Sequence, residues 1–138
     1  MKILYLAVFV FLSLFAYGCS SKYDSTQPLA GINPEYLCQH WLHSREEEQQ
    51  TDKDEIYRPK NFKEFPASHF RMQYIFYKNG DCDWFFLAPD DGHHFKRGKW
   101  SVDPKDKNIL HITKDDTMET YRVNELTKTV MRIARINP

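Results

Sequence analysis

The feature that most constrains the fold is a series of short segments rich in β-branched and aromatic residues, which runs from Leu37 to the end of the chain. Turn-forming residues separate these segments, and little of the sequence has helical periodicity. The candidate strands cover residues 37–44, 55–58, 70–77, 82–87, 94–102, 108–113, 118–126 and 129–136. Seven to nine short strands, most simply eight, predict an all-β fold that is a small antiparallel barrel or sandwich. We favour the β-barrel because closure leaves no strand edge exposed.

The clearest local signal is a β-hairpin between Phe70 and Leu87, with Asn79-Gly80 between its two strands. Asn-Gly is the preferred pair for a type I′ turn of two residues, in which both residues have positive φ. That turn predicts a register in which paired residue numbers sum to 159. One face then carries Met72, Tyr74, Phe76, Asp83, Phe85 and Leu87, and the other carries Gln73, Ile75, Tyr77, Cys82, Trp84 and Phe86. Both faces are largely apolar, so the second face is core, lines a cavity or contacts a partner.

The first 18 residues are typical of a secretory signal peptide. Lys2 provides the positive start, residues 3–15 are almost entirely apolar, and small residues lead to Cys19. The apolar stretch is shorter than the ~20 residues that span a bilayer. Small residues at positions −3 and −1 before a cysteine resemble the lipobox of bacterial lipoproteins. The resemblance implies cleavage before Cys19, a diacylglycerol on its thiol and an acyl chain such as palmitate on its amino group. The alternatives are an uncleaved signal anchor and ordinary cleavage that leaves Cys19 free.

These boundaries divide the chain into a lipoprotein signal peptide at 1–18, a lipidated cysteine with a flexible tether at 19–34, and a barrel domain at 35–138. The expected location is the bacterial cell envelope, with the protein bound to the membrane through its N-terminal lipid. Ser20 favours the outer membrane over the inner one, because Asp at this position retains a lipoprotein in the inner membrane in enterobacteria. The domain then faces the periplasm or the cell surface.

Charge and cysteine content narrow the classes of function. The chain has 19 Lys and Arg against 19 Asp and Glu, so it lacks the basic excess of a nucleic-acid-binding protein. Aromatic residues make up 15% of the chain, which argues against a disordered protein. With Cys19 lipidated, Cys38 and Cys82 remain as an even pair in an oxidising compartment. These two residues either form a disulfide or stay as two buried thiols.

A tryptophan early in the first strand, eight short strands and a late arginine resemble the lipocalin pattern. In lipocalins a Gly-x-Trp motif opens the first strand, and an arginine from the last strand packs over that tryptophan. The resemblance assigns the tryptophan to Trp41, although no glycine precedes it here, and the arginine to Arg132 or Arg135. Segments 57–59, 65–71, 79–80, 88–91 and 98–100, the last ending in Trp100, are similar to the lipocalin-like domain of uncharacterised Gram-negative bacterial lipoproteins. The resemblance covers residues 37–136 and implies a compact barrel but no particular ligand.

The second face of the hairpin and two nearby arginines supply the candidate ligand-binding residues: Arg58, Arg71, Gln73, Ile75, Tyr77, Trp84 and Phe86. Aromatic walls with a few polar anchors suit an amphiphile with an anionic head, although the same aromatic residues could simply be core. The resulting hypothesis is a non-enzymatic protein without a cofactor that binds or carries a small hydrophobic ligand in the barrel. The alternative is a protein-interaction module, such as a periplasmic lysozyme-inhibitor-like lipoprotein, that acts through the exposed Ala88–His94 loop or the Arg45–Glu55 run.

Metal and catalytic sites are not expected. Neither His93-His94 nor the pair His40 and His43 can chelate zinc alone, because adjacent residues and residues three apart in a strand point to opposite faces. The paired aspartates lie in predicted turns, where Asp is common for backbone reasons: Asp81 and Asp83, Asp90 and Asp91, Asp115 and Asp116. No residue is therefore assigned a catalytic role.

Overall fold

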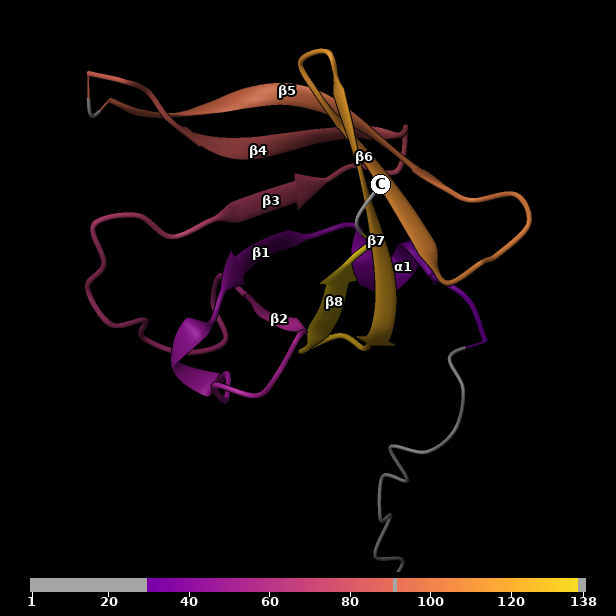
Figure 1. The fold of residues 1–138 in the computed structure, drawn as a ribbon, viewed down its shortest axis with the longest axis horizontal. Helices are drawn as coiled ribbons and strands as arrows, with labels where there is room; N and C mark the ends of the chain where they lie inside the picture. Colours follow the sequence, from indigo (N-terminus) through magenta and orange to yellow (C-terminus); the bar gives the residue numbers. More distant parts are fainter. Residues whose placement is uncertain (1–29, 91, 137–138) are drawn as a thin grey trace, which may run out of the picture.

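The computed structural model describes residues 30–90 and 92–136, which form a closed antiparallel β-barrel of eight strands (Figure 1). The expected all-β class and barrel are thereby confirmed. A short helix, α1 (Pro34–Leu37), precedes the barrel, and a 3-10 turn, η1 (Arg45–Glu47), follows the first strand. The strands are β1 (His40–His43), β2 (Glu55–Pro59), β3 (Gln73–Phe76), β4 (Asp81–Leu87), β5 (His93–Val102), β6 (Ile109–Lys114), β7 (Thr117–Leu126) and β8 (Met131–Arg135).

The order of the strands around the barrel is β1-β2-β8-β7-β6-β5-β4-β3. From β3 to β8 each strand pairs with the next one in the sequence, whereas β1 lies between β2 and β3, and β2 pairs with β8. Consequently β2 and β3 run in the same direction on either side of β1. Residues 60–72, here called the crossover segment, connect them by returning from one end of β1 to the other. This order departs from the continuous up-and-down meander of lipocalin barrels.

The β3–β4 hairpin forms as expected, but its register differs by one residue from the prediction. Tyr74 pairs with Trp84, so paired numbers sum to 158 and not to 159. The cause is a three-residue turn, in which the backbone N–H of Tyr77 donates to Asp81 at 2.9 Å and that of Gly80 donates to Tyr77 at 3.1 Å. Of the turn residues, Gly80 alone has a positive φ, 87°, which fits a type I turn ending in a left-handed glycine rather than a type I′ turn.

This shift changes which side chains face the barrel interior. Tyr74, Phe76, Cys82 and Trp84 point inward and are buried, with exposed fractions of 7% or less. The outward positions of the hairpin alternate with them and include Ile75, Tyr77 and Asp83. The predicted grouping of Ile75 and Tyr77 with Trp84 on one face is therefore wrong, because a one-residue change of register moves a side chain to the other face.

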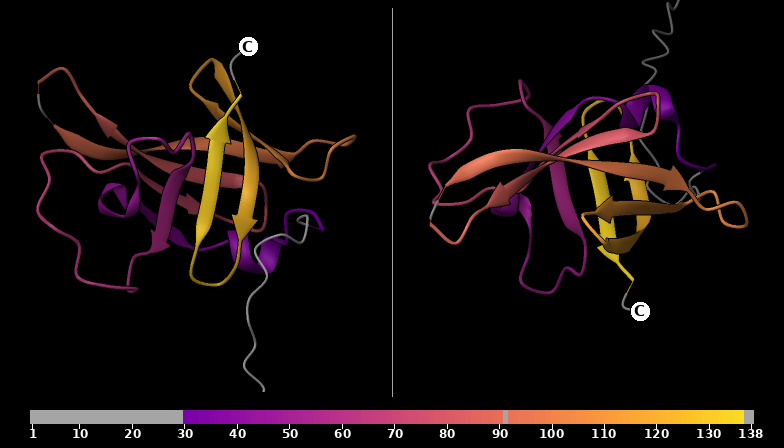
Figure 2. Two further views of the ribbon diagram at one scale, coloured as in Figure 1. Left: turned by 60° about the horizontal axis from the view of Figure 1, so that its bottom comes forward. Right: turned by 90° about the horizontal axis from the view of Figure 1, so that it is seen from above.

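The middle of the barrel is filled by large side chains that are at most 2% exposed: Trp41, Tyr57, Tyr74, Phe76, Leu110, Ile112, Val123, Met131 and Ile133. One end is covered by α1, whose Leu37 is fully buried and whose carbonyl at Leu37 accepts the indole N–H of Trp41 at 2.8 Å (Figure 2). The chain ahead of α1 also packs here, because Ile32 belongs to the core and its N–H donates to Lys107 at 2.9 Å. The opposite end of the barrel carries the cavity described below.

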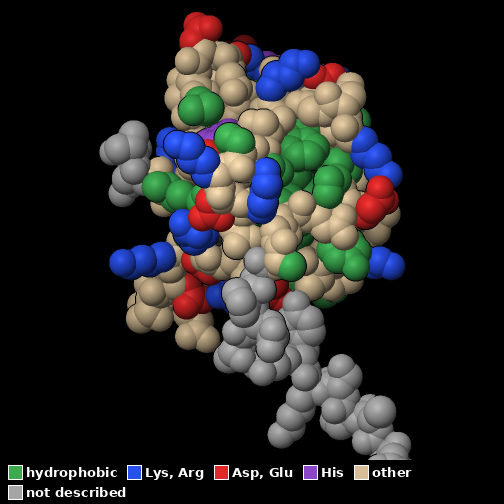
Figure 3. Space-filling view, turned by 90° about the vertical axis from the view of Figure 1, so that its right-hand side faces the viewer, with side chains coloured by type: hydrophobic (Ala, Val, Ile, Leu, Met, Phe, Trp, Pro, Cys, Tyr) green, Lys and Arg blue, Asp and Glu red, His purple; other side chains and the backbone are tan. Residues whose placement is uncertain are grey.

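Outside the barrel, apolar side chains gather on one face of the molecule, with lysine and arginine side chains around them (Figure 3). An open groove of about 560 Å³ lies between residues 30–34 and the side chains of Val102 and Lys107. Within the described ranges, no helix is long and apolar enough to cross a membrane. The predicted signal peptide, Cys19 and the first part of the tether lie outside the described residues.

Candidate functional site

A cavity of about 210 Å³ lies at the end of the barrel opposite α1. The first and last residues of several strands line it together with nearby loop residues: His43, Arg45, Glu55, Tyr57, Phe70, Met72, Tyr74, Lys114, Glu119, Tyr121 and Arg135. Alternation along a strand places residues two apart on the same side. Glu55 and Tyr57 of β2 therefore point inward together, as do Glu119 and Tyr121 of β7.

Five of these residues form a hydrogen-bonded group, here called the Glu119 cluster: Tyr74, Lys114, Glu119, Tyr121 and Arg135. The Lys114 ammonium lies 2.6 Å from Glu119 Oε2 and donates to the Tyr74 hydroxyl at 2.6 Å. The Tyr121 hydroxyl donates to Glu119 at 2.8 Å, and the Arg135 guanidinium lies 3.3 Å from the other carboxylate oxygen. Because these groups satisfy one another, and the Lys114 and Glu119 side chains are only 11% and 14% exposed, the cluster holds its side chains in defined orientations.

The ionisation states of the cluster follow from burial and neighbouring charge. Burial is the largest cause that raises the pKa of Tyr57, Tyr74 and Tyr121 well above the usual value of a phenol, and nearby carboxylates act in the same direction. For Glu119, burial acts to raise the pKa, but the hydrogen bond and charge of Lys114 outweigh it and the pKa is lowered. At neutral pH the cavity wall therefore presents protonated hydroxyls and an ionised Glu119.

A second part of the cavity wall is built around Glu55. Its carboxylate accepts the Tyr57 hydroxyl at 2.7 Å, and the Tyr57 ring stacks on His43 with centroids 5.0 Å apart. His43 is held from both ring nitrogens, since Nε2 lies 2.6 Å from Glu48 and Nδ1 accepts Arg45 Nε at 3.3 Å. Within residues 30–90 and 92–136, Tyr57 is the one hydrogen-bond donor to the Glu55 side chain, and Arg45 has no carboxylate partner. This side of the wall thus keeps unused hydrogen-bonding capacity.

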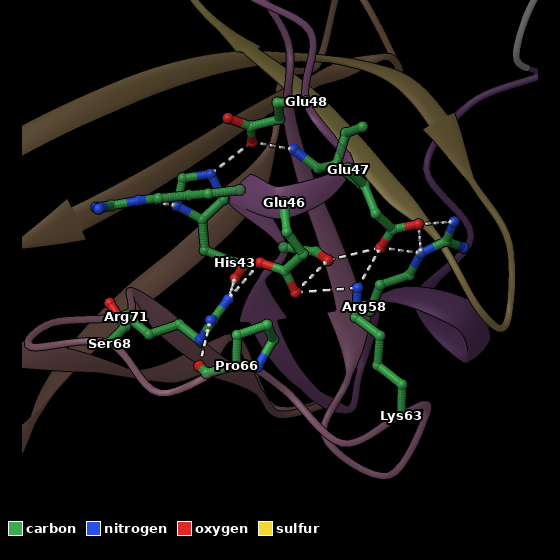
Figure 4. A network of polar contacts seen from close by, with 12 residues as sticks. His43, Glu46, Glu47, Glu48, Arg58, Lys63, Pro66, Ser68 and Arg71 are labelled. Atoms are coloured by element: carbon green, nitrogen blue, oxygen red, sulfur yellow. Dashed lines mark hydrogen bonds and ion pairs between the residues drawn. The ribbon is translucent and has the colours of Figure 1, made fainter.

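Two of the predicted site residues, Arg58 and Arg71, lie outside the barrel in a network of ion pairs with η1 (Figure 4). The Arg58 guanidinium is 2.7 Å from Glu47, and that of Arg71 is 3.0 Å from Glu46. Lys63 lies 3.0 Å from both carboxylates. These ion pairs hold the crossover segment against η1. The two arginines therefore stabilise the fold and do not line the cavity.

The other predicted site residues are divided between the two sides of the barrel wall. Gln73 bonds the His40 ring at 2.8 Å on the outer surface, and Tyr77 is 37% exposed with its hydroxyl donating to Asp83. Trp84 lies inside the barrel, and Phe86 packs edge-on against it with centroids 5.4 Å apart. Ile75 pairs with Asp83 on the outer face. The structure does not bring these residues together into one pocket, and their predicted role in binding stays untested.

The residues assigned by the lipocalin resemblance make other contacts than the expected ones. Trp41 is buried, and Trp100 is half-buried with its indole N–H donating to the Tyr77 carbonyl at 2.8 Å. Arg132 lies 3.7 Å from Asp52 and from Asp54, whereas Arg135 belongs to the Glu119 cluster. In the described part of the chain, neither arginine makes a cation–π contact with Trp41.

Thiols and histidines form no further site here. Cys38 and Cys82 are free thiols, so the considered disulfide is not formed, and burial raises the pKa of Cys82 to about 11. His93 stacks on Phe85, whereas His94 packs against Phe86 on the other side of the strand. Among the residues that the structure describes, no group of three or more His, Cys, Asp or Glu could hold a metal ion.

Comparison of the chain with protein-family models, with curated proteins and with solved structures finds no match. The interpretation of the cavity therefore rests on its own geometry.

The sequence analysis missed most of the cavity wall, although a signal was present. Glu55-Ile56-Tyr57 and Glu119-Thr120-Tyr121 both place an acidic residue two positions before a tyrosine. In a strand this spacing puts the carboxylate and the phenol side by side on one face. Such a pair on the inner face of a barrel is unusual, and it marks a polar end of the interior.

Proposed function

We propose that this protein binds a small molecule in the cavity at the end of the barrel, without catalysing a reaction, while a lipid on Cys19 tethers it to a membrane of the bacterial cell envelope. The observation that carries the proposal is a cavity walled by buried polar side chains, in a barrel whose remaining interior is packed. Buried polar groups in fixed orientations are what specific small-molecule sites use to orient a ligand.

The size and polarity of the cavity favour a different ligand from the small hydrophobic molecule expected from the sequence. Sites for drug-sized ligands measure roughly 300–1,000 Å³, so about 210 Å³ suits a smaller molecule or the head of a larger one. Because Trp41, Phe76 and other core side chains fill the middle of the barrel, a long apolar chain has no room to enter. The ligand expected here is a small one with polar groups, and Phe70 and Met72 supply its apolar contacts.

A binding role is favoured over an enzymatic one by the pairing within the Glu119 cluster. General acid–base catalysis uses a group that can gain or lose a proton near neutral pH. Glu119 is ionised and paired with Lys114 at 2.6 Å, and the tyrosines keep their protons. These groups are therefore suited to donating and accepting hydrogen bonds to a ligand.

The test is a matched pair of substitutions on the same chain. Met72→Trp fills the cavity, whereas Ile75→Trp adds the same side chain on the outer surface of the barrel. We expect a small molecule bound to the wild type, detected by native mass spectrometry or by NMR titration with a fragment library, to be lost in Met72→Trp and kept in Ile75→Trp. A wild type that carries no ligand and shows no shift of cavity-wall resonances with any fragment contradicts the proposal.

A protein-interaction role is the second candidate, and it is supported by the outer face of the β4–β5 hairpin, which projects from the barrel (Figures 1 and 2). Phe95 is 39% exposed there, with centroids 5.1 Å from Phe85, and His93 stacks on the Phe85 ring. Exposed aromatic side chains on a projecting hairpin suit contact with a protein partner. If the partner is a lysozyme, equimolar protein should lower lysozyme activity, and unchanged activity at excess protein removes this candidate.

A further inference from the structure

The geometry points to a zwitterion of amino-acid size as the ligand of the cavity, a molecule that carries both a carboxylate and an ammonium group. This inference rests on the proposed binding function and adds the chemical class of the ligand. It follows from which charged groups of the wall are already neutralised within the protein and which are left for a ligand.

The wall carries three cationic side chains, Arg45, Lys114 and Arg135, and two anionic ones, Glu55 and Glu119. Lys114 and Glu119 are 2.6 Å apart and neutralise each other inside the cluster, where their side chains are 11% and 14% exposed. The charges that remain for a ligand are those of Arg45 and Arg135 on one hand and Glu55 on the other. Groups of both signs are therefore available in one small cavity.

The two arginines have most of their hydrogen-bond donors free for a carboxylate. A guanidinium has five N–H groups in a planar fork that matches a carboxylate. Arg45 uses Nε on His43 at 3.3 Å, and Arg135 uses one terminal nitrogen on Glu119 at 3.3 Å. The other N–H groups of each arginine are left to bind an anionic group at the mouth of the cavity.

Glu55 offers the complementary site for a cation. An ionised carboxylate accepts about four hydrogen bonds, and Tyr57 supplies one of them at 2.7 Å. That bond fixes the orientation of the carboxylate, because Tyr57 itself is fully buried and stacked on His43. An ammonium group, with three donors, fits the remaining capacity of Glu55.

Ligands with a single charge fit this wall less well. A simple carboxylate that reaches the arginines is repelled by Glu55, and a simple amine at Glu55 is repelled by Arg45 and Arg135. Like charges brought together repel each other, whereas a zwitterion pairs with both signs at once. The volume of about 210 Å³ suits a molecule of this size, with Phe70 and Met72 beside its side chain.

The experiment compares three probes that differ in which charged groups they carry, using the full chain and isothermal titration calorimetry. The common L-amino acids are screened first, and the best binder is then compared with the amine that lacks its carboxylate and with the acid that lacks its amino group. We expect the zwitterion to bind at least about tenfold more tightly than either analogue. An acid that binds as tightly as the amino acid overturns the inference.

A variant of Glu55 tests the assigned residue directly. Glu55→Gln keeps an oxygen that accepts the Tyr57 hydroxyl but removes the negative charge. We expect it to weaken the amino acid at least tenfold and to leave the acid analogue unchanged or tighter, with an unchanged melting temperature. Glu64→Gln, on the exposed crossover segment, is the control and should bind as the wild type does.

The two proposals fail in different ways. If no amino acid binds but the Met72→Trp and Ile75→Trp pair shows another ligand in the cavity, the ligand class is wrong and the binding function stands. If neither experiment finds a ligand, both fall together.

Discussion

At the scale of single residues, two aromatic side chains that the predicted hairpin register placed on the same face differ in their exposure. Trp84 is 7% exposed inside the barrel, whereas Tyr77 is 37% exposed and bonds Asp83 on the surface. Trp84→Ala should lower the free energy of unfolding by about 3–5 kcal/mol, because it opens a cavity in the core. Tyr77→Ala should cost less than about 1 kcal/mol. Urea denaturation of both variants measures this difference, and equal losses would contradict the register seen here.

The predicted hairpin register was wrong because the turn has three residues and not two. Asn79-Gly80 is compatible with a two-residue type I′ turn and with the three-residue turn that the structure adopts. The second form is stabilised by the Asn79 side chain, which accepts the backbone N–H of Asp81 at 2.9 Å. Hydrophobic alternation cannot choose between the two forms, because both faces of the hairpin are apolar. The hairpin itself was therefore predictable, but which of its side chains point into the barrel was not.

At the scale of elements, the crossover segment depends on ion pairs that should make the fold sensitive to acid. Glu46 and Glu47 both have a pKa lowered to about 2. For Glu46, burial acts against this shift but is outweighed by hydrogen bonds from its backbone, Lys63 and Arg71. For Glu47 the hydrogen bond from Arg58 is the largest cause.

The sign of the pH dependence follows from these shifts. The two carboxyls keep a usual pKa near 4.5 in the unfolded chain, so between about pH 4.5 and 2 the unfolded state binds more protons than the folded one. Their stabilisation is complete above pH 4.5 and lost as the pH falls through 2. We expect the melting temperature to fall across this window, and to fall less steeply in a Glu46→Gln, Glu47→Gln double variant. Circular dichroism melts measure both slopes, with Glu64→Gln as control, and equal slopes in the double variant and the wild type would show that the network does not support the crossover.

The strand order illustrates the same limit of prediction at the level of elements. Local propensity was enough to locate the strands, because each reads as a short β-type run between turns. The placement of β1 between β2 and β3 depends on contacts between distant residues, such as those of Arg71 with Glu46 and of Lys63 with Glu47. No local pattern encodes these pairs, so a simple meander was as compatible with the sequence as the observed order.

At the scale of the whole molecule, the cavity exists only after the barrel has closed. Glu55, Lys114, Glu119 and Arg135 come from four different strands, and their carboxylates and cations meet at one end of the interior. The paired acidic and tyrosine residues were visible in the sequence, but their convergence depends on closure and register together. The site was therefore recognisable in parts and not as a whole.

The proposed tether attaches to the barrel at the end away from the cavity. Ten residues lie between Cys19 and Ala30, where the described chain begins, and this stretch spans at most about 40 Å when extended. The chain enters the barrel beside α1, at the end opposite the cavity. A lipid on Cys19 would therefore attach the barrel to the membrane from its α1 end, away from the cavity mouth.

The decisive measurement for the tether is the mass of the N-terminal peptide from the membrane fraction of cells that express the full chain. We expect a peptide that begins at Cys19 and carries the mass of three acyl chains, because stable anchoring needs more than one chain. Cys19→Ala should abolish that mass, while Cys38→Ala should keep it, since Cys38 packs against the barrel core. A peptide that begins at Met1 would indicate an uncleaved anchor, and an unmodified Cys19 would indicate ordinary secretion. The first result would keep the chain attached to the membrane at nearly the same point, whereas the second would remove the attachment.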